Sequence, residues 1–369
     1  MCGWRARASA LTLLGMIEWH TCAQRAMVEK REGNDYWEET TMPLHDERGG
    51  WHAAMAGKGD PYSVMRVEHL VLLGRLHGGQ TVAGPADDLA PLHAASLLTI
   101  EEGRYRPAFF IADRAETTRI DRHARALGAQ LADALLARWT TLERHYATLT
   151  ISHTHTLTEL AFLLVGDRIL DVGLLDALAA EGELMPAAPP RPSPTDPQAR
   201  YYFWLIAGKA AQLGRYGQRV TALPWPGWEL ATFGQYQLDG QTNTAREALE
   251  VRVLECLATA QTTTPAALAA AFALPLLDHD DTARWVEAER FATAALVVVY
   301  KANEPDLRAL YASLRTSAAA PTGFGEFFCW YDHLAYAYAI DALSAAGAMS
   351  LPAARFAAML RHESAPDTF

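Results

Sequence analysis

Several features that would point to a particular function are scarce in this 369-residue sequence. It has four cysteines, Cys2, Cys22, Cys256 and Cys329, and no pair of them has the C-x-x-C spacing of redox or zinc motifs. No run of apolar residues reaches the roughly 18 that a membrane-spanning helix needs. The motifs G-x-G-x-x-G, G-x-x-x-x-G-K-[ST], H-E-x-x-H and G-x-S-x-G are absent. We therefore expect a protein of the reducing cytoplasm that has no membrane contact, no cofactor and no familiar catalytic constellation.

Positive charge is also in short supply, because the formal net charge is -11 at pH 7. An acidic chain repels the phosphate backbone, so nucleic-acid binding would need a segregated basic patch. Half of the residues are hydrophobic, and alanine, the strongest helix former, recurs throughout. Runs of β-branched residues are few and short. Composition therefore predicts a mainly α fold.

The first sixty residues show no clear periodicity. Arg5 and Arg7 precede an apolar run, Ala10–Ile17, which imitates a signal peptide, but Glu18-Trp19-His20 is a poor cleavage region. We therefore predict that 1–60 is a poorly ordered N-terminal tail.

Residues 61–112 contain the first patterned module. Apolar residues from Val64 to Leu76 predict a helix that ends at Gly78-Gly79, and a second helix follows Pro85. Two short strands on either side of Glu101-Glu102-Gly103 then predict a β-hairpin. Helix, helix and hairpin in this order resemble the winged helix-turn-helix of MarR- and PadR-type regulators.

The resemblance implies DNA binding, with the hairpin as the wing and Arg104 and Arg106 as the candidate phosphate contacts. Between Gly79 and the wing this sequence has one clear helix, which carries Asp87 and Asp88, where the family has two, the second being the recognition helix. We therefore interpret the module as a degenerate winged helix, which suits protein contacts as well as it suits DNA.

An internal repeat is the most informative feature of the remainder. Shifted by 165 residues, 142–184 aligns without a gap on 307–349. The aligned identities include Tyr146/Tyr311, Phe162/Phe327, Asp167/Asp332 and Gly182/Gly347. We interpret the repeat as a duplicated α-helical hairpin whose copies bury each other's apolar faces; chance similarity between Ala- and Leu-rich helices is the alternative.

These patterns give a mainly α fold with a degenerate winged-helix module, duplicated α-helical hairpins and small β-hairpins. The predicted divisions after the module are a first helical hairpin, a Pro-rich linker, an aromatic helix with a small β-hairpin, a helix-turn-helix-like segment and a second helical hairpin: 113–185, 186–199, 200–243, 244–306 and 307–369.

The equivalent acids Asp167 and Asp332 lie in apolar stretches, and Arg168 and His333 follow them directly. Buried acids need partners, so these four residues could converge near a pseudo-two-fold axis. Aromatic residues, including Trp330 and Tyr331, would then supply the walls of a ligand pocket. The alternative is a salt bridge with a purely structural role.

Two histidine-containing segments could in principle ligate a metal. They are His153-Thr154-His155 and Asp278-His279-Asp280-Asp281. A polar interhelical loop explains the first, and an acidic helix N-terminus explains the second. We therefore predict no metal site.

The sequence leaves three functions open. The first is a winged-helix-like regulatory protein, a ligand-responsive transcription regulator that contacts DNA through its wing. The second is a non-enzymatic scaffold that uses the same modules to bind a protein partner or a second copy of itself. The third is an enzyme with an unfamiliar helical active site.

Overall fold

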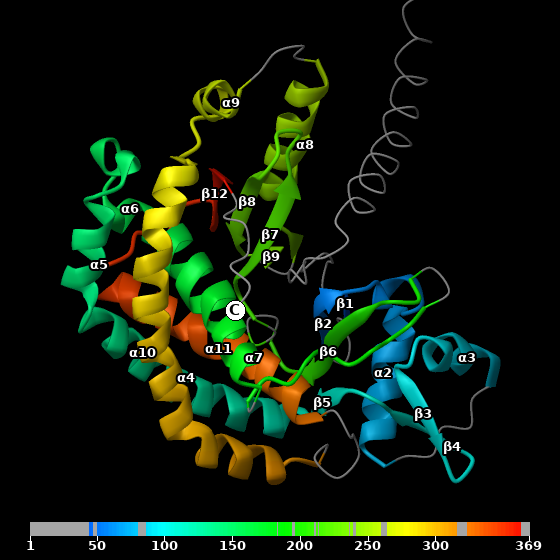
Figure 1. The fold of residues 1–369 in the computed structure, drawn as a ribbon. Helices are drawn as coiled ribbons and strands as arrows, with labels where there is room; N and C mark the ends of the chain where they lie inside the picture. The colour runs from blue at the N-terminus through cyan, green and yellow to red at the C-terminus, as the bar shows by residue number, and fades with distance from the viewer. Residues whose placement is uncertain are drawn as a thin grey trace, which may run out of the picture. The chain divides into compact units, whose positions relative to one another are not determined.

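A computed structural model of the chain describes residues 44–46, 50–79, 86–182, 184–193, 196–209, 212, 214–235, 237–238, 241–259, 264–315 and 323–362. Besides its helices, the described part of the chain contains two four-stranded sheets and two two-stranded hairpins (Figure 1). The fold is therefore mixed α and β. The predicted mainly α class, with only small β-hairpins, is wrong.

The first half of the chain contains the following elements: β1 (Leu44–Asp46), β2 (Trp51–Lys58), the 3-10 helix η1 (Pro61–Ser63), α2 (Val67–His77), α3 (Ala86–Ala94), β3 (Leu98–Glu101), β4 (Arg104–Pro107), β5 (Phe110–Ala112), α4 (Arg114–Leu136), α5 (Trp139–Tyr146), the 3-10 helix η2 (Thr150–His153), α6 (Leu157–Ala161), the π-helix η3 (Phe162–Gly173), α7 (Leu174–Glu181) and β6 (Arg200–Ala207).

The second half contains β7 (Gly217–Ala222), β8 (Trp228–Gly234), β9 (Gln237–Leu238), β10 (Gln241–Thr242), α8 (Thr244–Thr259), α9 (Pro265–Phe272), β11 (Leu276–Leu277), α10 (His279–Ala312), α11 (Gly323–Ala345) and β12 (Phe356–His362).

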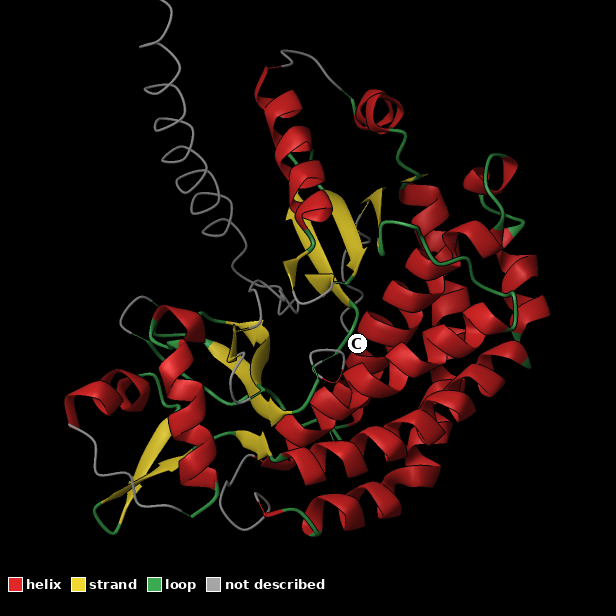
Figure 2. Ribbon diagram, turned by 180° about the vertical axis from the view of Figure 1, so that it is seen from behind, coloured by secondary structure: helices red, strands yellow, loops and turns green. Residues whose placement is uncertain are grey.

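The two four-stranded sheets have the same topology. Sheet 1 has the order β1-β2-β6-β5, and sheet 2 has the order β7-β8-β12-β11. In each sheet the first three strands of this order pair antiparallel. The fourth strand, β5 in sheet 1 and β11 in sheet 2, pairs parallel with its neighbour. Figure 2 shows the sheets as two separate groups of strands beside the helices. We call sheet 1 with α2, α3 and the β3–β4 hairpin lobe 1, and sheet 2 with α8 and α9 lobe 2.

The register of the strands shows that the repeat extends beyond the helices. Trp51 of β2 pairs with Ala207 at one end of sheet 1, and Trp228 of β8 pairs with His362 at the same end of sheet 2. β2 and β8 also share the sequence W-x-x-A-x-x-G in this register. We therefore treat 44–207 and 217–362 as two copies of one unit.

The long helices of the two copies also correspond residue by residue. Asp113 caps α4 and Asp278, 165 residues later, caps α10. Each carboxyl three residues further on accepts a hydrogen bond from the other copy: Glu116 from the backbone N–H of Arg315, and Asp281 from that of Thr150. Thr150 and Arg315 are themselves 165 residues apart, so the two bonds are related by a pseudo-two-fold axis.

The two copies exchange their helices when they pack. α4 packs along α11, and α10 packs against η3 and α7. Sheet 1 rests on α11, which belongs to the second copy, whereas sheet 2 rests on η3, which belongs to the first. Each sheet therefore needs the other copy to cover it, and neither copy could bury its core alone.

Three predicted assignments are wrong. The predicted tail ran to residue 60, yet Trp51–Lys58 is an inner strand of sheet 1; residues 1–43 lie outside the described part. The aromatic run after Tyr201 was predicted as a helix and forms β6, because an apolar run buried on both faces carries neither periodicity. The chain after Thr244 was predicted as helical throughout, yet the last element that the structure describes is the strand β12.

Gly234 closes β8 with φ +154°, and a Cβ there would lie 2.4 Å from the Cα of Phe356. We expect Gly234→Ala to lower the free energy of unfolding by more than about 1 kcal/mol. Alanine rarely adopts a φ of +154°, and its Cβ would collide with the backbone of the neighbouring strand β12. Denaturant unfolding measures the loss. Gly79→Ala is the matched control, because Gly79 also has positive φ but nothing within 4 Å. Equal losses in the two variants would contradict the packing argument.

Candidate interaction site on lobe 1

The residues predicted to share a ligand pocket have separate partners. Asp167 lies in η3 and accepts a hydrogen bond from Arg361 of β12 at 3.1 Å, beside Glu229 of β8. Arg168 faces α10, where its Nε and Nη2 atoms donate to Glu289 at 2.6 and 2.9 Å. These contacts tie η3 to sheet 2 and to α10.

The other members of the predicted pocket lie on α11. Asp332 accepts a hydrogen bond from the hydroxyl of Tyr300 on α10. His333 donates to the carbonyl of Cys329, and its ring lies against Trp204 of sheet 1. Trp330 donates to the carbonyl of Gln212 at 2.9 Å, and the hydroxyl of Tyr331 lies 2.7 Å from Nδ1 of His123. Asp167, Arg168, Asp332 and His333 therefore make four different contacts.

Burial dominates the protonation of the two equivalent acids. It raises the pKa of Asp332 to about 7, although the Tyr300 hydroxyl and nearby His333 act in the opposite direction. It also raises the pKa of Asp167 to about 6, against the positive charges of Arg361 and Arg168. Such shifts occur at functional sites, but buried structural networks produce them too. Here each acid has a buried partner, Arg361 of β12 for Asp167 and Tyr300 of α10 for Asp332, which favours the structural interpretation.

A different feature stands out when the two copies are compared. α3 and α9 end alike: Ser96 and Ala273 have φ near +55°, and the next backbone N–H, of Leu97 or Leu274, bonds five residues back. The second copy then enters β11 almost at once, whereas the first copy adds the β3–β4 hairpin before β5. The hairpin is therefore an addition to the repeated unit.

The hairpin has a tight tip and two unlike faces. Glu102 and Gly103 both have positive φ, as in the two-residue turns that favour hairpins. Arg104 and Arg106 lie on its polar face, and Glu101 pairs with Arg106 at 2.8 Å. The opposite face carries Ile100, which is 51% exposed.

The base of the hairpin is held by a fully buried ion pair. Arg191 donates to the carbonyls of Ser96 and Ala108, which flank the hairpin, and to that of Tyr201. The same guanidinium bonds to Glu326 of α11, whose carboxylate also accepts from two backbone N–H groups of β5 and β6. Burial raises the pKa of Glu326 to about 7, with Arg191 acting against it.

Arg191 comes from the segment predicted as a Pro-rich linker, and neither it nor Glu326 was a candidate residue. The signal was weak: an arginine among prolines, and a glutamate among phenylalanines at the start of α11.

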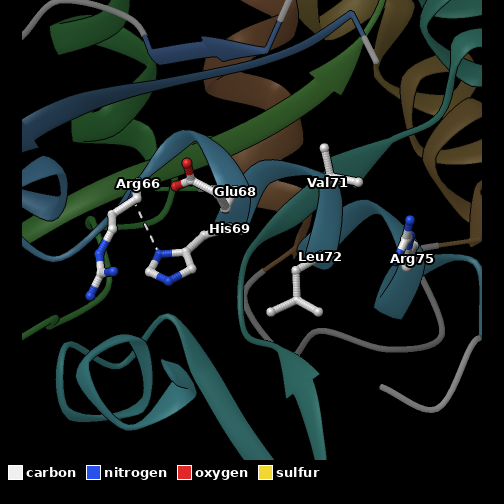
Figure 3. Close-up of a pocket in the computed structure, with 6 residues that line it drawn as sticks. All are labelled: Arg66, Glu68, His69, Val71, Leu72 and Arg75. Carbon is white, nitrogen blue, oxygen red and sulfur yellow. Dashed lines mark hydrogen bonds between the residues drawn. The ribbon is translucent and has the colours of Figure 1, made fainter. Parts of the chain in front are cut away.

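Beside the hairpin, the outer face of α2 forms an open hollow of about 300 Å³ (Figure 3). α2 also contacts β4, so the hollow and the hairpin belong to one surface. The apolar side chains that line the hollow are partly exposed, and its charged side chains are of both signs. The lining residues are Arg66, Glu68, His69, Val71, Leu72 and Arg75. The backbone N–H of Arg66 donates to the ring of His69 at 3.1 Å, which fixes the start of the helix.

No known family, curated protein or solved structure matches this chain. Within the described residues, no helix has the length and apolar character to cross a bilayer, and no cluster of side chains is suited to a metal ion.

Proposed function

We propose that this chain is a non-enzymatic regulatory protein of the cytoplasm that binds a protein partner through the surface formed by the α2 hollow and the β3–β4 hairpin. The carrying observation is that the hairpin was added to one copy of the repeat only. The second copy completes the same sheet without it, so the sheet itself does not require the hairpin.

The chemistry of this surface favours a protein over DNA. Its arginines lie close to acids: Glu68 comes between Arg66, just before α2, and Arg75 of α2, and Glu101 partly neutralises Arg106. DNA binding requires an excess of positive charge, whereas a mixed rim around partly exposed apolar residues is typical of protein interfaces. The partner that fits best is an amphipathic segment with an apolar anchor for Val71 and Leu72 and with charges of both signs.

The test compares proteins that co-purify with the wild-type chain and with Ile100→Asp, followed by titration of the recovered partner. We expect Ile100→Asp to weaken binding about tenfold or more, because it puts a charge in the apolar part of the interface. Val251→Asp is the matched control, since Val251 is a 40% exposed valine on α8, the lobe 2 counterpart of α2.

Two results would overturn the proposal. One is a partner that binds wild type and Ile100→Asp equally. The other is retention of duplex DNA at low salt that is lost in Arg104→Glu, which would make the hairpin a nucleic-acid contact.

A further inference from the structure

The solvent face of α10 carries an apolar stripe. Phe291 is 43% exposed and Val298 is 65% exposed, with exposed Ala294 between them. Spacings of three and four residues place all three on one side of the helix. α10 crosses the near side of the helix layer in Figure 1.

The first copy shows that the fold does not require this stripe. α4 and α10 bury the same positions, for example Thr117 and Thr282, or Leu131 and Leu296. At the positions of the stripe, 165 residues earlier, α4 has Ala126, Ala129 and Asp133, all exposed. The exposed phenylalanine and valine of the second copy are therefore not explained by the packing of the repeated unit, and they are candidates for a contact with another molecule.

We propose that α10 is the contact between two copies of this chain, paired antiparallel about a two-fold axis at Ala294. Phe291 lies three residues before Ala294 and Val298 four residues after it. Their midpoint lies within one residue of Ala294, so an antiparallel pair centred there places Phe291 next to Val298 of the partner subunit, twice by symmetry. The small side chain at the axis lets the two helices approach closely.

The charges at the ends of the stripe obey the same symmetry. Glu287 lies seven residues before Ala294 and Lys301 seven residues after it, so each Glu287 faces Lys301 of the partner subunit. Lys301 is anchored at its end by Glu181 of α7, at 2.7 Å. Near the other end of the stripe, the guanidinium of Arg138 lies 6.0 Å from the centre of the Phe291 ring and helps to fix the position of that ring. This self-complementarity about a single residue favours a second copy over an unrelated partner.

Light scattering coupled to size exclusion tests the contact on the full chain. We expect twice the chain mass for wild type and a single chain mass for Val298→Asp. That variant introduces the residue type that α4 carries at the equivalent exposed position, so the fold should tolerate it. Val251→Asp is the control and should keep the double mass, as should Ile100→Asp, which tests the lobe 1 surface. A monomeric wild type, or a dimer that survives Val298→Asp, would overturn the proposal.

A cysteine at the axis tests the geometry. Ala294→Cys should form a disulfide-linked dimer under mild oxidation, because symmetry brings the two Cys residues within bonding reach. Ala283→Cys, which is also exposed on α10 but lies eleven residues away, should not. Wild type run alongside accounts for the native cysteines. If Ala283→Cys links as readily as Ala294→Cys, the two-fold axis does not pass where we place it.

Discussion

Replacing Arg191 by methionine should lower the free energy of unfolding by about 3–5 kcal/mol, the cost typical of breaking a buried ion pair from one side. The variant leaves the carboxylate of Glu326 buried without its cation. It also leaves the carbonyls of Ser96, Ala108 and Tyr201 without their side-chain donor. Denaturant unfolding measures this loss of stability. The rate of amide hydrogen exchange, compared with wild type, should increase most in the hairpin at 98–107, because the hairpin loses its anchor.

The hairpin itself provides the control. Arg106 pairs with Glu101 while both side chains are about half exposed, and such pairs contribute at most about 1 kcal/mol. Arg106→Met should therefore unfold close to wild type. Glu326→Gln separates charge from packing, since the amide keeps an oxygen that can accept from the β5 and β6 backbone. Equal midpoints for Arg191→Met and Arg106→Met would contradict the role assigned to the buried pair.

The parts of this fold that depend on local pattern can be predicted from the sequence. The strands of the hairpin at 98–107 and those at 217–234 pair as turn residues and short apolar runs predicted. The described residues of 142–184 and of 307–349 form helices on both sides of the predicted turn, and a glycine with φ +70° or +75° follows the last helix of each segment. Helical periodicity and turn chemistry act over a few residues, so one sequence suffices to see them.

The sheets depend on contacts that no local pattern contains. β6 pairs with β2 about 150 residues away, and its apolar run has no alternation because both faces are buried. The relation between the copies was visible in the helices, where spacing is constant at 165, but not in the strands. The hairpin inserted in the first copy changes the spacing between copies, so a single gap-free shift misses the shared W-x-x-A-x-x-G.

The two acids at equivalent repeat positions have different partners for a related reason. Asp167 and Asp332 are equivalent in the repeat, and equivalence predicts symmetry of position, not contact. The helices are exchanged between copies, so Asp167 faces sheet 2 and meets Arg361, whereas Asp332 meets Tyr300. At the sheet 1 position equivalent to Arg361 the chain has Ile206, which leaves Asp332 without an arginine of its own.

Asp332→Asn should make the protein more stable in alkaline solution. Its pKa rises from the usual 3.8 to about 7 on folding, because burial disfavours the charge. The folded state then holds a proton that the unfolded state releases, so the contribution of this group is complete below 3.8 and is lost as pH rises to about 7. An asparagine cannot ionise, and its oxygen can still accept from Tyr300, so the variant escapes this loss.

The measurement is the free energy of unfolding at about pH 5 and pH 8. The difference between Asp332→Asn and wild type should grow by about 2–3 kcal/mol in favour of the variant, from 1.36 kcal/mol per pKa unit. Asp167→Asn is the matched comparison at the other repeat position. Its pKa rises only to about 6, so a smaller pH-dependent gain is expected, and Arg361 loses a partner there. A difference for Asp332→Asn that does not change with pH would show that the carboxyl is already ionised, and that the polar groups around it hold a charge that burial alone would expel.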